Sequence, residues 1–370
     1  MPPLLEARRL RKVFRAGGLA RPESETVALA DLSLSLSVES PCFTALAGES
    51  GSGKTTIARL LLGLAAPSSG QVLHRDKDLQ QMSRQDRRAF RQEVQAIFQD
   101  PFEVYNPFYK VDHLLHTPVA RFGLARSKAE ARELIEAALQ TVGLRPDETL
   151  GRYPHQLSGG QRQRITIARA LLLKPRLIIA DEPVSMVDAS LRATILESLH
   201  RLHRDFGIAF LYITHDLTTA YQVSDHLVIL YRGAVVEAGK VEQVVGEPQH
   251  PYTQELIRSI PAPDPGRAWL EAGAAEPMEE DPANAAAGGC LYVGRCPRAM
   301  PHCRLRRPML RCTAPQRAVA CHLYEDAAPL ENQDLTAVLQ DSPSVLGDGA
   351  RPTLGPGASG DHHQSRSEDG

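Results

Sequence analysis

The chain has 370 residues, of which 42% are hydrophobic, so it can bury a large α/β core and still carry an appendage. Its formal net charge of −2 predicts no basic surface for nucleic acid. The sequence contains no apolar run of about 18 residues, so we predict no transmembrane helix. Residues 1–8 lack the apolar region of a signal peptide. Six cysteines in this length do not indicate a secreted disulfide scaffold, so we expect a cytoplasmic protein.

The first motif is a phosphate-binding loop between a short apolar strand, residues 43–47, and a helix over residues 55–64. Its glycines let backbone N–H groups turn inward and cradle phosphate oxygens. Lys54 is expected to reach the β- and γ-phosphates, and the Thr55 hydroxyl to ligate Mg²⁺. A glycine turn that binds nothing is disfavoured, because strand, loop and helix are all in place. The loop and the next threonine comprise Gly48, Glu49, Ser50, Gly51, Ser52, Gly53, Lys54, Thr55 and Thr56.

Further along the chain, an apolar strand over residues 94–98 ends at Gln99. Residues 101–160 are polar, and residues 127–142 have the 3.6-residue apolar period of a helix. This part ends at a second glycine-containing motif, made of Leu157, Ser158, Gly159, Gly160 and Gln161. A serine and two glycines before a helix predict a second anion-binding N-terminus. A simple serine N-cap is also consistent, but it does not explain the glycine pair.

Two later strands end in polar residues. Residues 177–180 form an apolar run that ends at Asp181 and Glu182, and the carboxyl ends of parallel strands are where nucleotides bind. One carboxylate for a metal ion and one for a water molecule suit phosphoryl transfer. A third apolar strand ends before His215, although a single histidine at such a place is more often structural.

In this order, the motifs resemble the ATP-binding cassette (ABC) ATPases, which implies an α/β P-loop NTPase fold. The family has a RecA-like core, an antiparallel β subdomain and a helical signature subdomain, here residues 101–160 within a domain over 1–260. The resemblance implies that two subunits pack head to tail, so that each signature closes over the ATP on its partner's phosphate loop. The signature residues concerned are Ser158, Gly159, Gly160 and Gln161, and Asp188 belongs to the dimer-contact loop.

The resemblance also implies residue roles. Asp181 holds Mg²⁺ through water, Glu182 polarises the attacking water, and His215 contacts the γ-phosphate. Gln99 touches Mg²⁺ and relays contacts to the transporter, and Phe14 stacks on adenine. Between Ser185 and Asp188 the family commonly has the pair Ala-Leu, whereas this chain has Met186-Val187. The change keeps an apolar pair of similar volume, which packing usually tolerates.

The C-terminal part is predicted as a linker over 261–288, a Cys-rich domain over 289–325 and a disordered tail over 326–370. About thirty residues cannot build an adequate core alone. Zinc is possible, although the closely spaced cysteine pairs that it favours do not occur here. The spacing of Cys290, Cys296, Cys303 and Cys321 resembles the C-terminal domain of oligopeptide/dipeptide and nickel import ATPases, where four cysteines hold a [4Fe–4S] cluster. Cys312 is the additional one, and free thiols are the remaining alternative.

That resemblance implies an ATPase subunit at the cytoplasmic face of the cell membrane. Its partners are a second ABC ATPase subunit, identical or different, two membrane permease subunits and, indirectly, an extracytoplasmic substrate-binding protein. Nucleic acid is not expected. Peptides are the expected cargo, with oligosaccharides or nickel as alternatives. A non-transport ABC ATPase and a redox-sensing module that gates the ATPase are the alternatives from other classes.

Overall fold

The computed structural model describes residues 2–18, 21–100, 104–260 and 288–340. A nine-stranded sheet forms its centre, in the order β14-β12-β13-β11-β10-β4-β9-β8-β7. Five strands are parallel, and β11 continues the sheet antiparallel to β10. The bounds are β4 Phe43–Ala47, β7 Val94–Ile97, β8 Leu177–Asp181, β9 Ala209–Thr214, β10 His226–Tyr231 and β11 Ala234–Lys240.

Because β4, β7, β8 and β9 are parallel, their carboxyl ends meet at one edge of the sheet. The phosphate loop follows β4, Gln99 follows β7, Asp181 ends β8 and His215 follows β9. Every residue of β4, β8 and β9 is buried, as expected for apolar strands covered on both faces. The sheet thus gathers four sequence-distant motifs at one place.

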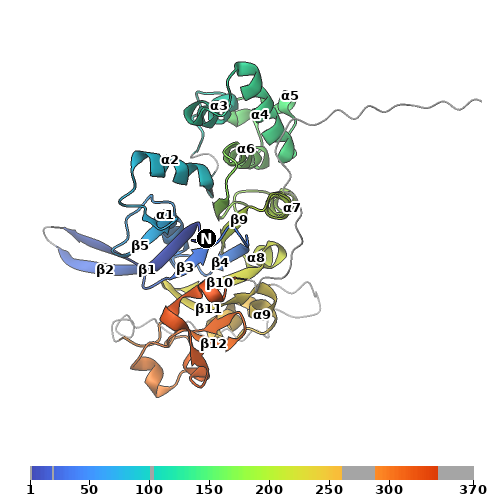
Figure 1. Cartoon of the computed structure of the whole chain (residues 1–370). Helices are drawn as coiled ribbons and strands as arrows, with labels where there is room; N and C mark the ends of the chain where they lie inside the picture. Colours follow the sequence, from blue (N-terminus) through green and yellow to red (C-terminus); the bar gives the residue numbers. More distant parts are fainter. Residues whose placement is uncertain (1, 19–20, 101–103, 261–287, 341–370) are drawn as a thin grey trace, which may run out of the picture.

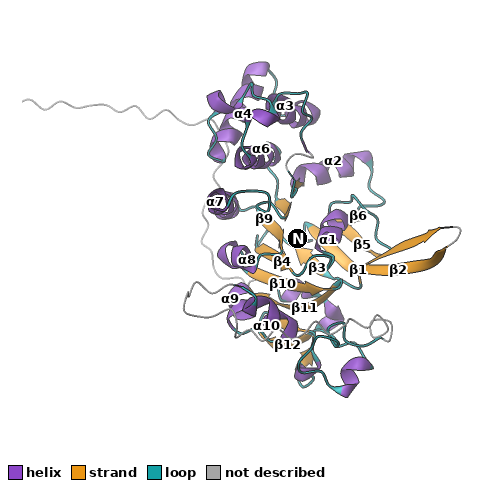
Figure 2. Cartoon of the chain, turned by 180° about the vertical axis from the view of Figure 1, so that it is seen from behind, coloured by secondary structure: helices purple, strands orange, loops and turns teal. Residues whose placement is uncertain are grey.

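A second, antiparallel sheet has the order β2-β1-β5-β6, with β3 paired to β1. Figure 2 shows β1 and β2 as a long hairpin that extends away from the rest of the chain. Helix α1, Lys54–Leu61, contacts strands of both sheets, and its buried residues Ile57 and Leu60 join the two into one core cluster. The strands are β1 Leu5–Gly18, β2 Arg21–Leu29, β3 Leu34–Leu36, β5 Ser69–His74 and β6 Lys77–Asp78.

Helices α3, α4 and α5 lie together at one end of the molecule, beyond α6 (Figure 1). The helix expected over 127–142 is α4, which Ser127 caps by accepting the N–H of Glu130. The bounds here are α2 Arg84–Glu93, α3 Val111–Phe122, α4 Lys128–Thr141, α5 Pro146–Thr149, η2 Pro154–Gln156 and α6 Gly159–Leu171. The others are α7 Ala189–Phe206, α8 Leu217–Val223, α9 Val241–Gly246 and α10 Pro251–Arg258.

The C-terminal module, residues 288–340, continues the central sheet, because β13 pairs antiparallel with β11. Its aromatic residue Tyr292 is buried in the same cluster as residues of β4 and β8. Its elements are η4 Pro301–Arg304, β12 Arg311–Ala314, β13 Arg317–Val319, η5 His322–Tyr324, β14 Ala328–Pro329, η6 Glu331–Gln333 and η7 Leu335–Ala337.

The expectation that the chain is disordered from residue 326 is wrong for residues 326–340. Leu330, Leu335, Val338 and Leu339 are buried in the core cluster that includes β1 and β3. The N–H of Leu335 donates to the carbonyl of Ser33 at 2.9 Å. These four apolar side chains anchor the segment. Residues 341–370, and residues 261–287 of the linker predicted over 261–288, lie outside the described residues.

Within the described residues, none of the helices combines the length and the apolar character that are needed to cross a bilayer.

Candidate nucleotide-binding site

The phosphate loop requires glycine at both of its ends. At Gly48 a β-carbon would lie 2.2 Å from the carbonyl oxygen of Leu230, and at Gly53 one would lie 2.3 Å from that of Ala28. Gly53 also has a φ of 104° and stands directly before α1. These close approaches hold the loop against neighbouring strands, so that the N-terminus of α1 opens toward the edge of the sheet.

Lys54 reaches back across this loop. Its ammonium group donates to the carbonyl oxygens of Gly48 at 2.7 Å and Glu49 at 2.8 Å. Burial lowers the pKa of Lys54, and the carboxylates of Glu182, Asp181 and Glu49 oppose that shift. A buried positive charge at the centre of the loop provides a site for an anionic phosphate group.

Asp181 lies at the end of β8, facing the same place. It is 7% exposed, and its Oδ1 atom has no hydrogen-bond partner among the described residues. Burial raises the pKa of its carboxyl, whereas a hydrogen bond with Thr55 lowers it. An orphaned, buried carboxylate oxygen beside a threonine hydroxyl fits a divalent cation, because hard cations take oxygen ligands.

The next residue, Glu182, has an unusual backbone and a histidine partner. Its φ of 46° lies in the left-handed region, which is uncommon for a residue other than glycine. Its N–H donates to the carbonyl of Ile213 at 2.9 Å, which fixes this turn against β9. Its Oε1 lies 2.9 Å from Nδ1 of His215, whose side chain is 57% exposed. The pair therefore faces open space at the sheet edge.

A cavity of about 380 Å³ brings these motifs together. Glycine-loop residues form one wall, and residues from three strand ends form the other. The lining comprises Ser50, Gly51, Gly53, Lys54, Thr55, Thr56, Gln99, Glu182 and His215. Nine of the residues proposed from the sequence thus share one cavity.

The signature residues do not line this cavity. The hydroxyl of Ser158 accepts the N–H of Gln161, and the side chain of Gln161 accepts the N–H of Ser158, so the pair forms a capping box on α6. A β-carbon at Gly160 would lie 2.8 Å from Cδ1 of Leu191 on α7. Glycine at this position therefore allows α6 to pack closely on α7, which the sequence alone did not indicate.

Phe14 and Asp188 also lie outside the cavity lining. Phe14 is on β1, 50% exposed, with the ammonium of Lys12 5.2 Å from its ring centroid. Asp188 directly precedes α7. In the substituted pair before it, Val187 is buried but Met186 is 59% exposed, so only one of the two packs inside.

Comparison with known proteins agrees with this geometry. Residues 32–185 match the family model of the ABC transporter, and residues 236–303 match that of the oligopeptide/dipeptide transporter C-terminal region. The oligopeptide transport ATP-binding protein OppF of Escherichia coli is 40% identical over 269 residues, which are 71% of this chain and 78% of OppF. The chain belongs to the oligopeptide/dipeptide-type ABC transporter ATP-binding proteins.

Two further comparisons support this ABC family assignment. YkfD of Bacillus subtilis is 38% identical over 335 residues, which are 89% of this chain and 98% of YkfD. The dimeric ATP-binding cassette MJ0796, in a post-hydrolysis state bound to ADP and Pi, superposes with a TM-score of 0.57 at 25% identity. That match covers 64% of this chain and 98% of MJ0796. The ABC ATPase fold expected from the sequence is confirmed, and the chain is an ABC-type ATPase.

In the C-terminal module Cys303 is buried and Cys312 is exposed, whereas Cys290, Cys296 and Cys321 are half-buried. The backbone N–H of Cys290 donates to the carbonyl of Cys303 at 2.8 Å. Burial first, and then the neighbouring thiols of Cys290, Cys296 and Cys303, raise the pKa of Cys321 to about 11. The four residues selected by their spacing are therefore neighbours in space.

Sequence analysis missed two residues that hold the phosphate loop from outside. The hydroxyl of Tyr252 accepts the N–H of Glu49 at 2.9 Å, and the guanidinium of Arg295 pairs with the Glu49 carboxylate. Both lie far from the loop in sequence. No pattern around Tyr252 or Arg295 in the sequence indicates a side chain aimed at the loop.

Proposed function

We propose that this chain hydrolyses ATP at the cytoplasmic face of a membrane to drive the import of oligopeptides or dipeptides. The observation that carries the proposal is the combination of the cavity beside Lys54 and Glu182 with a C-terminal region of the oligopeptide/dipeptide transporter type. The relative OppF, named as an oligopeptide transport ATP-binding protein, supports the peptide cargo.

In the proposed site, the phosphates lie on residues 48–55, with Lys54 on the β- and γ-phosphates. Thr55, Gln99 and Asp181 would hold Mg²⁺, which when bound neutralises charge on the phosphate oxygens. Glu182 orients and deprotonates the attacking water, and its partner His215 contacts the γ-phosphate. The strained backbone at Glu182 and its bond to Ile213 support a fixed position for this carboxylate.

A second ATPase subunit, identical or different, completes the proposed site. Within one chain, Ser158–Gln161 lie outside the cavity that holds Lys54, so a partner's signature would have to close over the nucleotide. The capping box leaves the signature as a rigid helix N-terminus, which suits an anion. Asp188, before α7, is proposed to line the same subunit contact, and Phe14 to stack on adenine.

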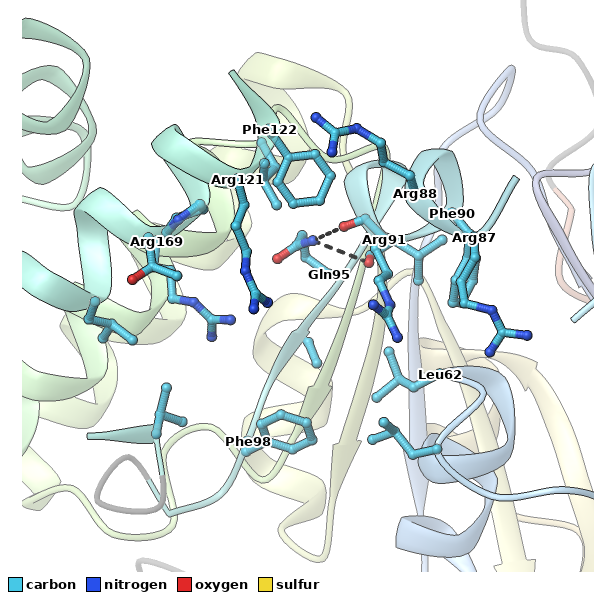
Figure 3. A pocket seen from close by; sticks show the side chains of 18 of the residues that line it. Leu62, Arg87, Arg88, Phe90, Arg91, Gln95, Phe98, Arg121, Phe122 and Arg169 are labelled. Carbon is cyan, nitrogen blue, oxygen red and sulfur yellow. Dashed lines mark hydrogen bonds between the residues drawn. The ribbon is translucent and has the colours of Figure 1, made fainter. Parts of the chain in front are cut away.

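A membrane permease is proposed to dock in the large groove shown in Figure 3. The groove has a volume of about 1130 Å³ and lies between α2, β7 and the helical subdomain. Its floor includes Leu62 and Phe98, and its rim is basic. The rim arginines are Arg87, Arg88, Arg91, Arg121 and Arg169. Because β7 leads from this groove directly to Gln99, a partner seated there would contact the strand that ends in the catalytic cavity.

For the C-terminal module we propose that Cys290, Cys296, Cys303 and Cys321 hold a [4Fe–4S] cluster. The electrostatic interaction of the Cys321 thiol with those of Cys290, Cys296 and Cys303 supports this proposal, because four neighbouring thiols are the ligand set of such a cluster. Iron and sulfide both absent after anaerobic purification would exclude it.

Uptake in cells that lack this gene tests the proposal. Complementation with wild type is expected to restore entry of labelled peptides, and Glu182→Gln is not. Labelled oligosaccharides and nickel are measured in parallel. If uptake of oligosaccharides or nickel is restored instead, the assignment as a transport ATPase stands and the proposed cargo is wrong. Unchanged uptake of all three would contradict an import function.

A further inference from the structure

Arg295 joins the C-terminal module to the phosphate loop. Its guanidinium donates to the two carboxylate oxygens of Glu49 at 3.1 and 3.0 Å, and to Oε1 of Glu255 at 2.5 Å. A bidentate arginine–carboxylate pair is stronger and more directional than a single charged contact. The link connects two residues that are 246 positions apart in the sequence.

An aromatic cluster holds this arginine in place. Tyr252 and Tyr292 are buried, with their ring centroids 5.5 Å apart. The guanidinium carbon of Arg295 lies 5.7 Å from the centroid of Tyr292 and 6.0 Å from that of Tyr231, which is within the range of cation–π contacts. The hydroxyl of Tyr292 donates to Glu255, the second carboxylate that Arg295 binds.

The position of Glu49 makes this contact important for an anionic ligand. Glu49 is the second residue of the loop, and its carboxylate interacts electrostatically with the Lys54 ammonium. A carboxylate so close to the phosphate cradle repels a phosphate group unless a cation balances its charge. Arg295 supplies that cation, and the side chain of Arg295 is only 28% exposed, so solvent screens the pair in part.

We propose that Arg295 is a positioning residue for nucleotide binding: it neutralises Glu49 and turns its carboxylate away from the phosphates. The C-terminal module thereby sets the affinity of the phosphate loop for ATP. This inference rests on the proposed nucleotide site. Loss of the guanidinium is expected to raise KM for ATP about three- to tenfold and to change kcat less than about twofold.

The test measures KM and kcat of ATP hydrolysis, and Kd for MgATP by calorimetry, in the full chain. Arg295→Ala should raise both KM and Kd. Glu49→Gln added to that variant should restore them to within about twofold of wild type, because the uncompensated charge is gone. Arg304→Ala, which changes an exposed arginine of the same module, is the matched control and should leave them unchanged.

An unchanged KM in Arg295→Ala would overturn the proposal, and so would a raised KM that Glu49→Gln does not restore. The single variant Glu49→Gln gives an independent test that does not depend on the folding of Arg295→Ala. It should bind ATP at least as well as wild type, and a tenfold loss would contradict the electrostatic role. Lys54→Ala separates the two proposals, because intact MgATP binding in that variant would reject the nucleotide site itself.

Discussion

Nδ1 of His215 lies 2.9 Å from Oε1 of Glu182, although the two residues follow different strands of the central sheet. We expect Glu182→Gln to retain ATP binding and to lose hydrolysis by about 10²- to 10⁴-fold, because an amide cannot accept the proton of the attacking water. Phosphate release under saturating MgATP measures this loss, and calorimetry measures binding. Turnover within about threefold of wild type would reject Glu182 as the catalytic carboxylate.

A charge change in the basic groove should reduce substrate uptake without reducing the ATPase rate of the isolated chain. Arg121→Glu places a negative charge on the rim of the groove. If a permease docks there, substrate uptake should fall about tenfold or more, because like-charged or unpaired groups at an interface cost several kcal/mol. The ATPase rate of the isolated chain should stay within about twofold.

Arg126→Glu is the matched control for this change, since Arg126 is exposed and does not line the groove. Its uptake should equal that of wild type. Equal uptake by both variants would argue against docking in this groove.

Leu335 tests the packing of the segment that was expected to be disordered. Its side chain is fully buried against the antiparallel sheet, so Leu335→Ala should lower the free energy of unfolding by about 2–5 kcal/mol. Chemical denaturation of the purified chain measures the change. Leu305→Ala, at a site 77% exposed, should cost less than about 1 kcal/mol. Similar values for both would contradict the burial of Leu335.

The buried His250 is expected to make the folded protein less stable as the pH falls. Burial lowers its pKa to about 4, compared with about 6.5 in an unfolded chain. The unfolded state therefore binds more protons between these values, so stability is complete above pH 6.5 and decreases as the pH falls toward 4. The full contribution is on the order of 3 kcal/mol, since a tenfold change in proton affinity corresponds to about 1.4 kcal/mol.

The variant His250→Asn isolates this effect. Asparagine can still accept the N–H of Tyr252, as Nδ1 of His250 does at 3.1 Å, but it does not titrate. Denaturation at several pH values between 7 and 4 should show a flatter profile for this variant than for wild type. His155→Asn, at an exposed histidine, should retain the wild-type profile, and parallel profiles for all three would refute the assignment.

The local parts of the fold followed directly from the sequence. Residues 43–47 are β4 as expected, because a continuous apolar run between turns fits a strand buried on both faces. Ser127 begins α4 at the residue where the apolar period starts, since its hydroxyl satisfies a free N–H group. The residues of the candidate nucleotide cavity could also be selected from the sequence, because each of them lies in a short motif that directly follows a predicted strand.

The long-range contacts could not be predicted in this way. No periodicity indicates that β13 pairs with β11, or that Leu335 packs beneath the sheet of β3. The contact of Arg295 with Glu49 joins residues 246 positions apart, and no local pattern around either residue indicates it. Such pairings depend on which surfaces meet once the chain has collapsed, and a single sequence contains no local signal for them.

The hydrogen bond between Leu335 and Ser33 has a consequence for synthesis on the ribosome. The strand pair β1–β3 emerges early, but its covering segment follows about 300 residues later. At elongation rates of about 5–20 residues per second, that interval lasts roughly 15–60 s. During that time the apolar face around β3 has no C-terminal cover, so a nascent chain must keep it from other apolar surfaces until residues 330–339 have been synthesised.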